Sequence, residues 1–283
     1  MDYGRRNTKK YSFRCPDLKV LRKLSSFVVD PLDFKQRHRK LLSVLSVDVV
    51  EGIFSVLVQF YDPLYRCFTF PDYQRMPTLE EYAHLLGILF RIGKATIFAQ
   101  AGSMDAFEDI FVLLIYGLAL FPNIDGFVDV NAIRIFLIRN HVPTLLGDMY
   151  FSLHLRNFKG GGTIVCCVPL LYRLMSLTND DIVWYDSTLD SLDIIDSCGE
   201  FSNVPLIGTQ GGIKYNPTLA RRQLEFPFRD KPNNTQLEGL FYQEGKDPQH
   251  LKQKMIHAWH NVHRIGRSEL GLRNYVALEA YTI

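Results

Sequence analysis

Apolar and polar positions alternate with a helical period over most of the chain. A helix is predicted at residues 46–61, where apolar side chains recur at intervals of three and four and so share one face. A second is predicted from Leu79 to Leu86, because Thr78 and Glu81 have the spacing of a capping box. Similar patterns predict helices at residues 18–27, 130–139, 143–158, 163–176, 218–224 and 248–262.

The stretch from Asp105 to Phe121 has a different pattern. From Ile110 onward, apolar residues lie on every side rather than on one face, which is typical of a helix enclosed by its neighbours. The stretch is shorter than the roughly 20 apolar residues that a membrane span needs. We therefore predict that it forms the central buried helix of the core.

Residues 181–213 change period and favour strands. Short β-rich runs at residues 182–185, 192–195 and 204–207 are separated by Asp, Ser and Gly, as in small hairpins. The predicted fold is therefore mainly α: an irregular multi-helix domain around a central buried helix, with a small β-hairpin unit near residues 181–213.

Charge is distributed unevenly along the 283 residues. The formal net charge is only +2, yet residues 1–40 hold twelve Lys or Arg against four Asp, a local excess of +8. We expect a basic N-terminal arm (residues 1–24), a single helical domain (residues 25–265) and a C-terminal tail (residues 266–283). An arm of this kind contacts nucleic acid or directs nuclear import, or is simply a solvated tail. The candidate nucleic-acid contacts are Arg5, Arg6, Lys9, Lys10 and Arg14.

Two further features of the sequence indicate the cellular compartment of the protein. The first ten residues contain no apolar run of the kind found in secretory signals. Five cysteines at irregular spacing do not resemble a disulfide framework. We expect a protein that is not secreted and that lies in a reducing compartment.

The candidate catalytic chemistry is limited to one group of carboxylates. Asp186, Asp190, Asp193 and Asp196 are close in sequence, and such carboxylates bind the metals of two-metal nucleases. They also occupy turn positions, where Asp is common for local hydrogen bonding. The glycine-rich run at residues 208–212 lacks the context of a nucleotide-binding fingerprint. We expect no metal, no cofactor and no enzymatic activity; a nucleic-acid-processing enzyme that uses the four Asp is the alternative.

Several strings resemble one known family. Residues 64–87, Leu-Tyr-Arg-Cys-Phe-Thr-Phe-Pro-Asp-Tyr-Gln-Arg-Met-Pro-Thr-Leu-Glu-Glu-Tyr-Ala-His-Leu-Leu-Gly, resemble the signature of the plant mobile domain. The similarity is closer to a legume-rich branch described only as a domain of unknown function. Other strings of that branch resemble residues 60–65, 114–118, 120–125, 194–201 and 215–223. The motif residues that carry the resemblance are Thr78, Leu79, Glu81, Leu86 and Gly87, and it assigns them a structural role.

The resemblance implies a nuclear domain of plants that derives from a transposable element. Such a domain would interact with nucleic acid or with chromatin and silencing partners, and would have no membrane segment. The chain departs from the family pattern after Gly87 and around Arg173, where segments expected in relatives are missing. It therefore resembles an abridged copy, and a decayed, non-functional transposon remnant is a third interpretation.

Overall fold

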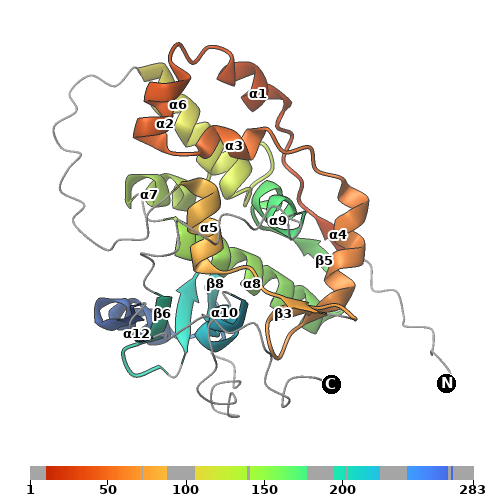
Figure 1. Cartoon of the computed structure of the whole chain (residues 1–283), viewed down its shortest axis with the longest axis vertical. Coiled ribbons are helices and arrows are strands. Elements are labelled where there is room, and N and C mark those ends of the chain that lie inside the picture. Colours follow the sequence, from red (N-terminus) through yellow and green to blue (C-terminus); the bar gives the residue numbers. More distant parts are fainter. Residues whose placement is uncertain are drawn as a thin grey trace.

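The computed structural model describes residues 11–71, 73–87, 106–138, 141–176, 194–201, 203–223, 241–266 and 269 (Figure 1). The α-helices are α1 (Lys19–Ser25), α2 (Pro31–His38), α3 (Leu41–Leu45), α4 (Glu51–Leu57), α5 (Leu79–Leu86), α6 (Ala106–Ile115), α7 (Val130–Ile138), α8 (Val142–Lys159), α9 (Val168–Met175), α10 (Pro217–Gln223) and α12 (Gln249–Ala258). The strands are β1 (Tyr11–Phe13), β2 (Tyr61–Asp62), β3 (Cys67–Thr69), β4 (Gln74–Arg75), β5 (Gly162–Ile164), β6 (Ile194–Cys198), β7 (Val204–Ile207), β8 (Gly211–Tyr215), β9 (Phe241–Gln243) and β10 (Val262–Ile265).

The strands form four small sheets in the described part of the chain, so the fold is mixed α/β. β1 pairs with β5 in parallel, and β6 pairs with β10 in antiparallel orientation. The other two sheets have three antiparallel strands each, in the orders β2-β3-β4 and β7-β8-β9. The prediction of a mainly α fold with a single hairpin unit was wrong. These strands have only two to five residues, too few for a period of two to show in the sequence.

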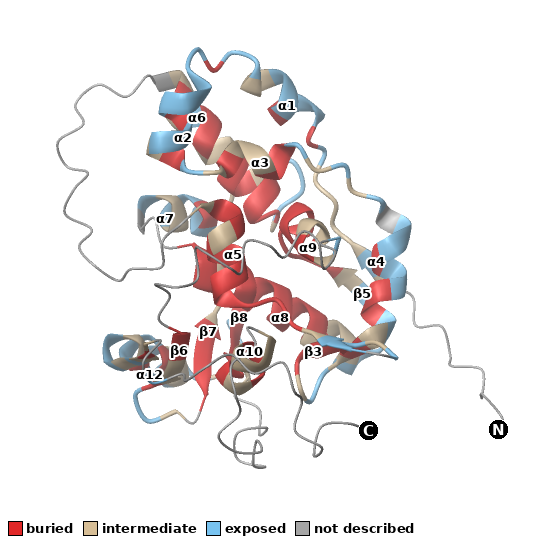
Figure 2. Cartoon of the chain, viewed as in Figure 1, coloured by how far each residue is buried: buried red, intermediate tan, exposed pale blue. Residues whose placement is uncertain are grey.

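The central helix is α8 rather than the apolar stretch at residues 105–121. Figure 2 shows α8 buried along most of its length between the sheets and the upper helices. Two of its buried polar residues are hydrogen-bonded inside the core: Asp148 bonds Thr209, and the Ser152 hydroxyl accepts the backbone N–H of Val165 at 2.8 Å. The sequence predicted this helix at residues 143–158 but not its central position, because these polar residues interrupt its apolar pattern.

The apolar stretch predicted to be the central helix, residues 105–121, contains an α-helix followed by a π-helical turn. α6 ends at Ile115, and a π-helical turn (η2, Tyr116–Leu120) follows it. The side chain of Ile110 is 59% exposed, so the prediction that every face is covered was wrong at the start of this stretch. The later part is enclosed: Tyr116 and Leu120 are buried, and the Tyr116 hydroxyl hydrogen-bonds His141 Nδ1 at 2.8 Å.

The sheet β7-β8-β9 lies directly on α8 and leaves no space between them. A Cβ at Gly211 would lie 2.1 Å from the Tyr242 carbonyl oxygen and 2.3 Å from the Phe151 ring. The Phe151 and Phe241 rings stack with centroids 5.1 Å apart. Glycine is therefore required at this position by close packing rather than by a turn.

Other boundaries differ from the predictions in smaller ways. The helix expected at residues 46–61 begins only at Glu51, as α4, and ends in a short 3-10 turn at Phe60. The helix expected at residues 163–176 is preceded by β5, and α9 begins at Val168 with a proline in its first turn. Among the described residues, none of the helices combines the length and apolarity needed to cross a membrane.

Candidate interaction surface

The five motif residues lie in α5 and at its two ends. Thr78 Oγ1 accepts the backbone N–H of Glu81 at 3.1 Å, and the Glu81 carboxylate accepts the Thr78 N–H at 2.9 Å. This is the capping box that the spacing predicts. Leu79 and Leu86 are fully buried, and Gly87 ends α5 in the left-handed conformation with φ 69°, which favours glycine.

Glu81 also connects α5 to α10. Its Oε1 accepts the side-chain amide of Gln223 at 2.7 Å, and Gln223 Oε1 accepts the backbone N–H of Met76 at 2.7 Å. The neighbouring Glu80 is buried, and this burial raises its pKa to about 7. Both carboxyl groups thus lie inside the fold, where hydrogen bonds and burial rather than solvent surround them.

The glycine-rich run at residues 208–212 binds a carboxylate of the chain itself. Asp148 on α8 accepts the Thr209 backbone N–H at 2.6 Å and the Thr209 hydroxyl at 3.0 Å. A Cβ at Gly208 would lie 2.3 Å from the Asp148 carboxylate. Burial raises the pKa of Asp148 to about 7. The loop therefore has the shape of an anion cradle, and Asp148 fills it.

One of the four carboxylates of the enzyme alternative is described. Asp196 on β6 pairs with Arg221 of α10 and lies 3.5 Å from His263 Nδ1 on β10. Asp186, Asp190 and Asp193 lie outside the described residues. No group of three or more His, Cys, Asp or Glu residues with metal-binding geometry occurs among the residues that the structure describes. The enzyme alternative stays a prediction.

The twelve cations of residues 1–40 fall into three classes. Arg5, Arg6, Lys9 and Lys10 lie outside the described residues. Four others hold the fold together: Arg14, which donates to the carbonyls of Pro122 and Asn123, Arg22, Arg37 and Lys40. The remaining four, Lys19, Lys23, Lys35 and Arg39, are exposed and make no ion pair within the described part of the chain.

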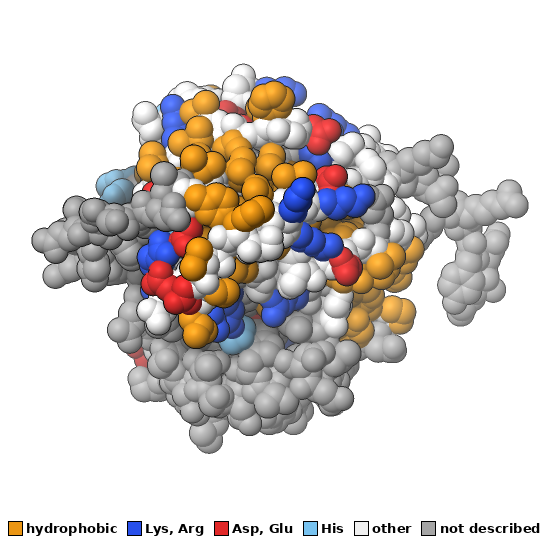
Figure 3. All heavy atoms as spheres, turned by 90° about the horizontal axis from the view of Figure 1, so that it is seen from above, with side chains coloured by type: hydrophobic (Ala, Val, Ile, Leu, Met, Phe, Trp, Pro, Cys, Tyr) orange, Lys and Arg blue, Asp and Glu red, His pale blue; other side chains and the backbone are white. Residues whose placement is uncertain are grey.

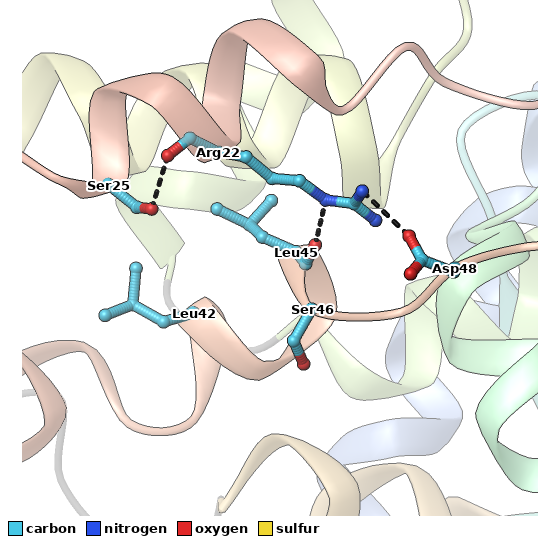
Figure 4. Close-up of a pocket in the computed structure, with 6 residues that line it drawn as sticks. All are labelled: Arg22, Ser25, Leu42, Leu45, Ser46 and Asp48. Carbon is cyan, nitrogen blue, oxygen red and sulfur yellow. Dashed lines mark hydrogen bonds and ion pairs between the residues drawn. The ribbon is translucent and has the colours of Figure 1, made fainter.

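Arg22 is an example of a cation that stabilises the fold through hydrogen bonds and an ion pair (Figure 4). It donates to the carbonyls of Leu45 and Val47 at 2.6 and 2.8 Å and pairs with Asp48 at 2.8 Å. An open pocket of about 290 Å³ lies beside it, between α1 and α3. The pocket is lined by Arg22, Ser25, Leu42, Leu45, Ser46 and Asp48.

Exposed apolar side chains lie beside these four exposed cations at one end of the molecule. We define the α1–α2 face by the apolar residues Val20, Phe27, Val29, Leu32 and Ile110 together with Lys19, Lys23, Lys35 and Arg39. Val29 is 92% exposed and Leu32 is 73% exposed. The Phe27 ring contacts Phe107 of α6 edge-on, with centroids 6.3 Å apart. Figure 3 looks onto this end and shows apolar side chains gathered there, with Lys and Arg at their edge.

Sequence reasoning identified the basic residues of this face but not its apolar ones. Leu32 lies in α2, which is capped by Asp30: its carboxylate accepts the backbone N–H of Leu32 at 2.9 Å, and Pro31 occupies the first helical position. The dipeptide Asp30-Pro31 is a helix-start signal that would have revealed α2. The exposure of Leu32 depends on tertiary packing, which no local pattern contains.

A family model described as "Domain of unknown function (DUF7745)" matches residues 21–92, 89–175 and 172–283. No curated protein and no solved structure matches the chain.

Proposed function

The chain belongs to the DUF7745 family, and from that premise we propose that it is a non-enzymatic interaction domain whose α1–α2 face binds an acidic, amphipathic segment of a partner protein. The observation that carries this proposal is the exposure of five large apolar side chains among exposed cations that form no ion pair with the described residues. A contiguous apolar surface rimmed by charge is typical of a protein-binding site.

The charge of the face favours an acidic partner. Residues 18–40 contain seven Lys or Arg against two Asp. Both acids are already engaged, because Asp30 caps α2 and Asp33 accepts Arg37 at 2.6 Å. A partner with apolar anchors and flanking carboxylates would complement both properties of the face.

The test uses the whole chain in three forms, purified from plant nuclei: wild type, Val29→Asp/Leu32→Asp, and the control Phe158→Asp/Ile256→Asp. The control replaces exposed apolar residues away from the face. We expect the first variant alone to lose specific proteins. Titration of each lost protein against purified chain should then give a Kd at least about tenfold weaker for the variant, since each apolar anchor contributes more than about 1.4 kcal/mol. Identical protein sets from all three forms would contradict the proposal.

Nucleic acid is a second candidate partner, favoured by the exposed cations. Lys19, Lys23, Lys35 and Arg39 can each neutralise a phosphate, and binding of this kind weakens steeply with salt. The slope of log K against log salt is negative, and charge reversal of all four should reduce its magnitude by up to about 3.6. Fluorescence anisotropy with a 30-base-pair DNA duplex measures this slope. Reversal of Lys246 and Lys254, which are exposed elsewhere, is the control and should change it less.

The resemblance to plant mobile domains supports a nuclear site of action and an origin in a transposable element. It also supports the remnant interpretation, in which the abridged gene yields no stable product. Expression of the tagged chain in plant cells separates these interpretations. A stable protein concentrated in nuclei is expected, whereas an aggregated or absent product would favour the remnant.

A further inference from the structure

A second exposed apolar surface lies on α7 and on the turn before it, on elements other than those of the α1–α2 face. Three apolar residues of α7, Val130, Ile133 and Leu137, are exposed, Leu137 to 71%. Their spacing of three and four residues places them along one side of the helix. In the turn, Ile124 is exposed and Phe127 is 70% exposed. We call these five residues the α7 face; Figure 2 shows exposed residues on α7.

The turn holds its two apolar side chains together. Ile124 and Phe127 form an antiparallel bridge, and the Phe127 N–H donates to the Ile124 carbonyl at 3.3 Å. Residues opposite each other in an antiparallel pair point to the same side. α7 begins directly after this turn, because the Asp129 carboxylate accepts the backbone N–H of Ala132 at 3.2 Å. The turn therefore lies at the start of the apolar row of α7.

The other side of α7 is packed against the body and fixes the position of the face. Ala132 is fully buried, and the Phe136 ring contacts Tyr116 edge-on, with centroids 5.4 Å apart. The turn is held in the same way, since a Cβ at Gly117 would lie 2.5 Å from a Val128 methyl group. The α7 face is thus presented by a supported helix and turn, and a partner can bind it without reordering them.

The α7 face carries one charge of each sign, unlike the α1–α2 face with its four exposed cations. Arg134 is exposed on α7, four residues after Val130 and three before Leu137, and Asp125 is exposed in the turn. Neither makes an ion pair with any residue that the structure describes. A surface with a cation on the helix and an anion in the turn is complementary to itself after a two-fold rotation.

We propose that the α7 face binds the same face of a second copy of this chain and forms a symmetric dimer. The two α7 helices run antiparallel across a two-fold axis near Val130. This arrangement places Phe127 of each copy beside Ile133 of the other, and Arg134 beside Asp125. Symmetry makes each of these contacts occur twice. The dimer does not rest on the function proposed for the α1–α2 face.

Analytical ultracentrifugation of the whole chain tests the dimer. Each half of the contact is one short helix and one turn, which is small for a stable interface, so we expect a Kd of about 1–100 µM. Val130→Asp places two like charges at the axis and should leave the chain monomeric up to about 200 µM, above that Kd range. A wild-type chain that is monomeric at this concentration, or a dimer that survives Val130→Asp, would overturn the proposal.

Charge exchange tests the partner and the orientation. Asp125→Arg and Arg134→Asp should each weaken the dimer about tenfold, because symmetry removes both ion pairs and brings like charges together. The double variant restores the pairs and should return to within about threefold of the wild-type Kd. The control Val29→Asp/Leu32→Asp alters the α1–α2 face and should leave the Kd unchanged. If Val130→Asp does not fold, the charge variants decide; a double variant no tighter than the single ones rules out this dimer.

Other occupants of the α7 face give different results. Urea denaturation of Val130→Asp should show a loss of no more than about 0.5 kcal/mol, as expected for an exposed position. A large loss together with a monomeric wild type would show that part of the chain itself covers the face. A monomeric wild type with no loss would leave the face to a different protein. Both results contradict binding between two copies.

Discussion

The body around α8 and the α1–α2 face differ in which side chains they bury and which they expose. Around α8, polar side chains such as Asp148 and Ser152 are buried and hydrogen-bonded, Asp148 to Thr209 and Ser152 to Val165. On the α1–α2 face, large apolar groups such as Val29 and Leu32 are left in solvent. Figure 2 shows the contrast between the buried α8 and the exposed surfaces of α1 and α2.

The difference separates two uses of apolar surface. Phe151 on α8 is 1% exposed and stacks on Phe241, so it stabilises the fold. Phe27 is 60% exposed and contributes little to folding, which leaves its surface available for binding. Substitutions around α8 should therefore mainly lower the free energy of unfolding. Substitutions on the α1–α2 face should mainly weaken partner binding.

The largest effect is expected from a matched pair of phenylalanine truncations. Phe151→Ala should lower the free energy of unfolding by about 3–5 kcal/mol, because it leaves a cavity against β8 and β9. Phe27→Ala should lower it by less than about 1 kcal/mol. Urea denaturation of both variants measures the difference. Equal losses would show that Phe27 belongs to the core and would remove the contrast.

The second effect is a pH dependence at the centre of the body. Burial raises the pKa of Asp148 from 3.8 to about 7 in the folded protein. Between these values the folded state keeps a proton that the unfolded state has lost, so this group lowers stability as pH rises from about 4 to 7. Asp148→Asn removes the effect. The free energy of unfolding of the variant minus that of wild type should therefore rise by up to about 4 kcal/mol over this range.

The comparison with wild type isolates Asp148 from other buried groups. Glu80 has a pKa raised to about 7, and His141 has a pKa lowered to about 4, both by burial. These groups are present in both proteins, so their contributions cancel in the difference. A difference that stays constant from pH 4 to pH 7 would mean that Asp148 is ionised throughout in the folded state.

A smaller effect on stability is expected at the N-terminus of α5. Thr78→Ala removes the hydroxyl that caps α5 and should lower the free energy of unfolding by about 0.5–2 kcal/mol. Thr69→Ala is the control, because Thr69 is exposed on β3. Urea denaturation of the two variants should show a clear loss for Thr78→Ala only. Equal small losses would mean that the capping box adds little to the packing of Leu79 and Leu86.

The smallest effect on stability is expected on the α1–α2 face itself. Val29→Asp/Leu32→Asp should change the free energy of unfolding by no more than about 0.5 kcal/mol per substitution, because both side chains are largely solvated. The same urea experiment measures it. A loss of several kcal/mol would show that these residues are covered in solution by part of the chain itself.

Local signals predicted the parts of the fold that depend on neighbours in sequence. The capping box of Thr78 and Glu81 and the helix predicted at residues 143–158 match α5 and α8 closely. The parallel pair of β1 and β5 was not predicted, because Tyr11 pairs with Gly162 and neither strand is long enough to show a pattern. The mixed α/β fold follows from several pairings of this distant kind.

The candidate surfaces were predicted only in part for a related reason. The count of cations drew attention to residues 1–40, but only tertiary contacts separate Arg14, which is bonded to carbonyls, from Lys19, which makes no ion pair with any residue that the structure describes. Arg66 is likewise buried and donates to the Lys214 carbonyl on β8, which is distant in sequence. Residue type and spacing indicated where charge lies, and packing decided which charges are available.

The most direct test of the account is site-specific photo-crosslinking in plant nuclei. A photoreactive amino acid is placed at Val29 on the α1–α2 face and, as the control, at Phe158, which is also exposed but lies at the end of α8. The account predicts discrete crosslinked partners from position 29, lost when Leu32→Asp is added, and none in common with position 158. An absence of specific crosslinks at position 29, or the same products from both positions, would contradict it.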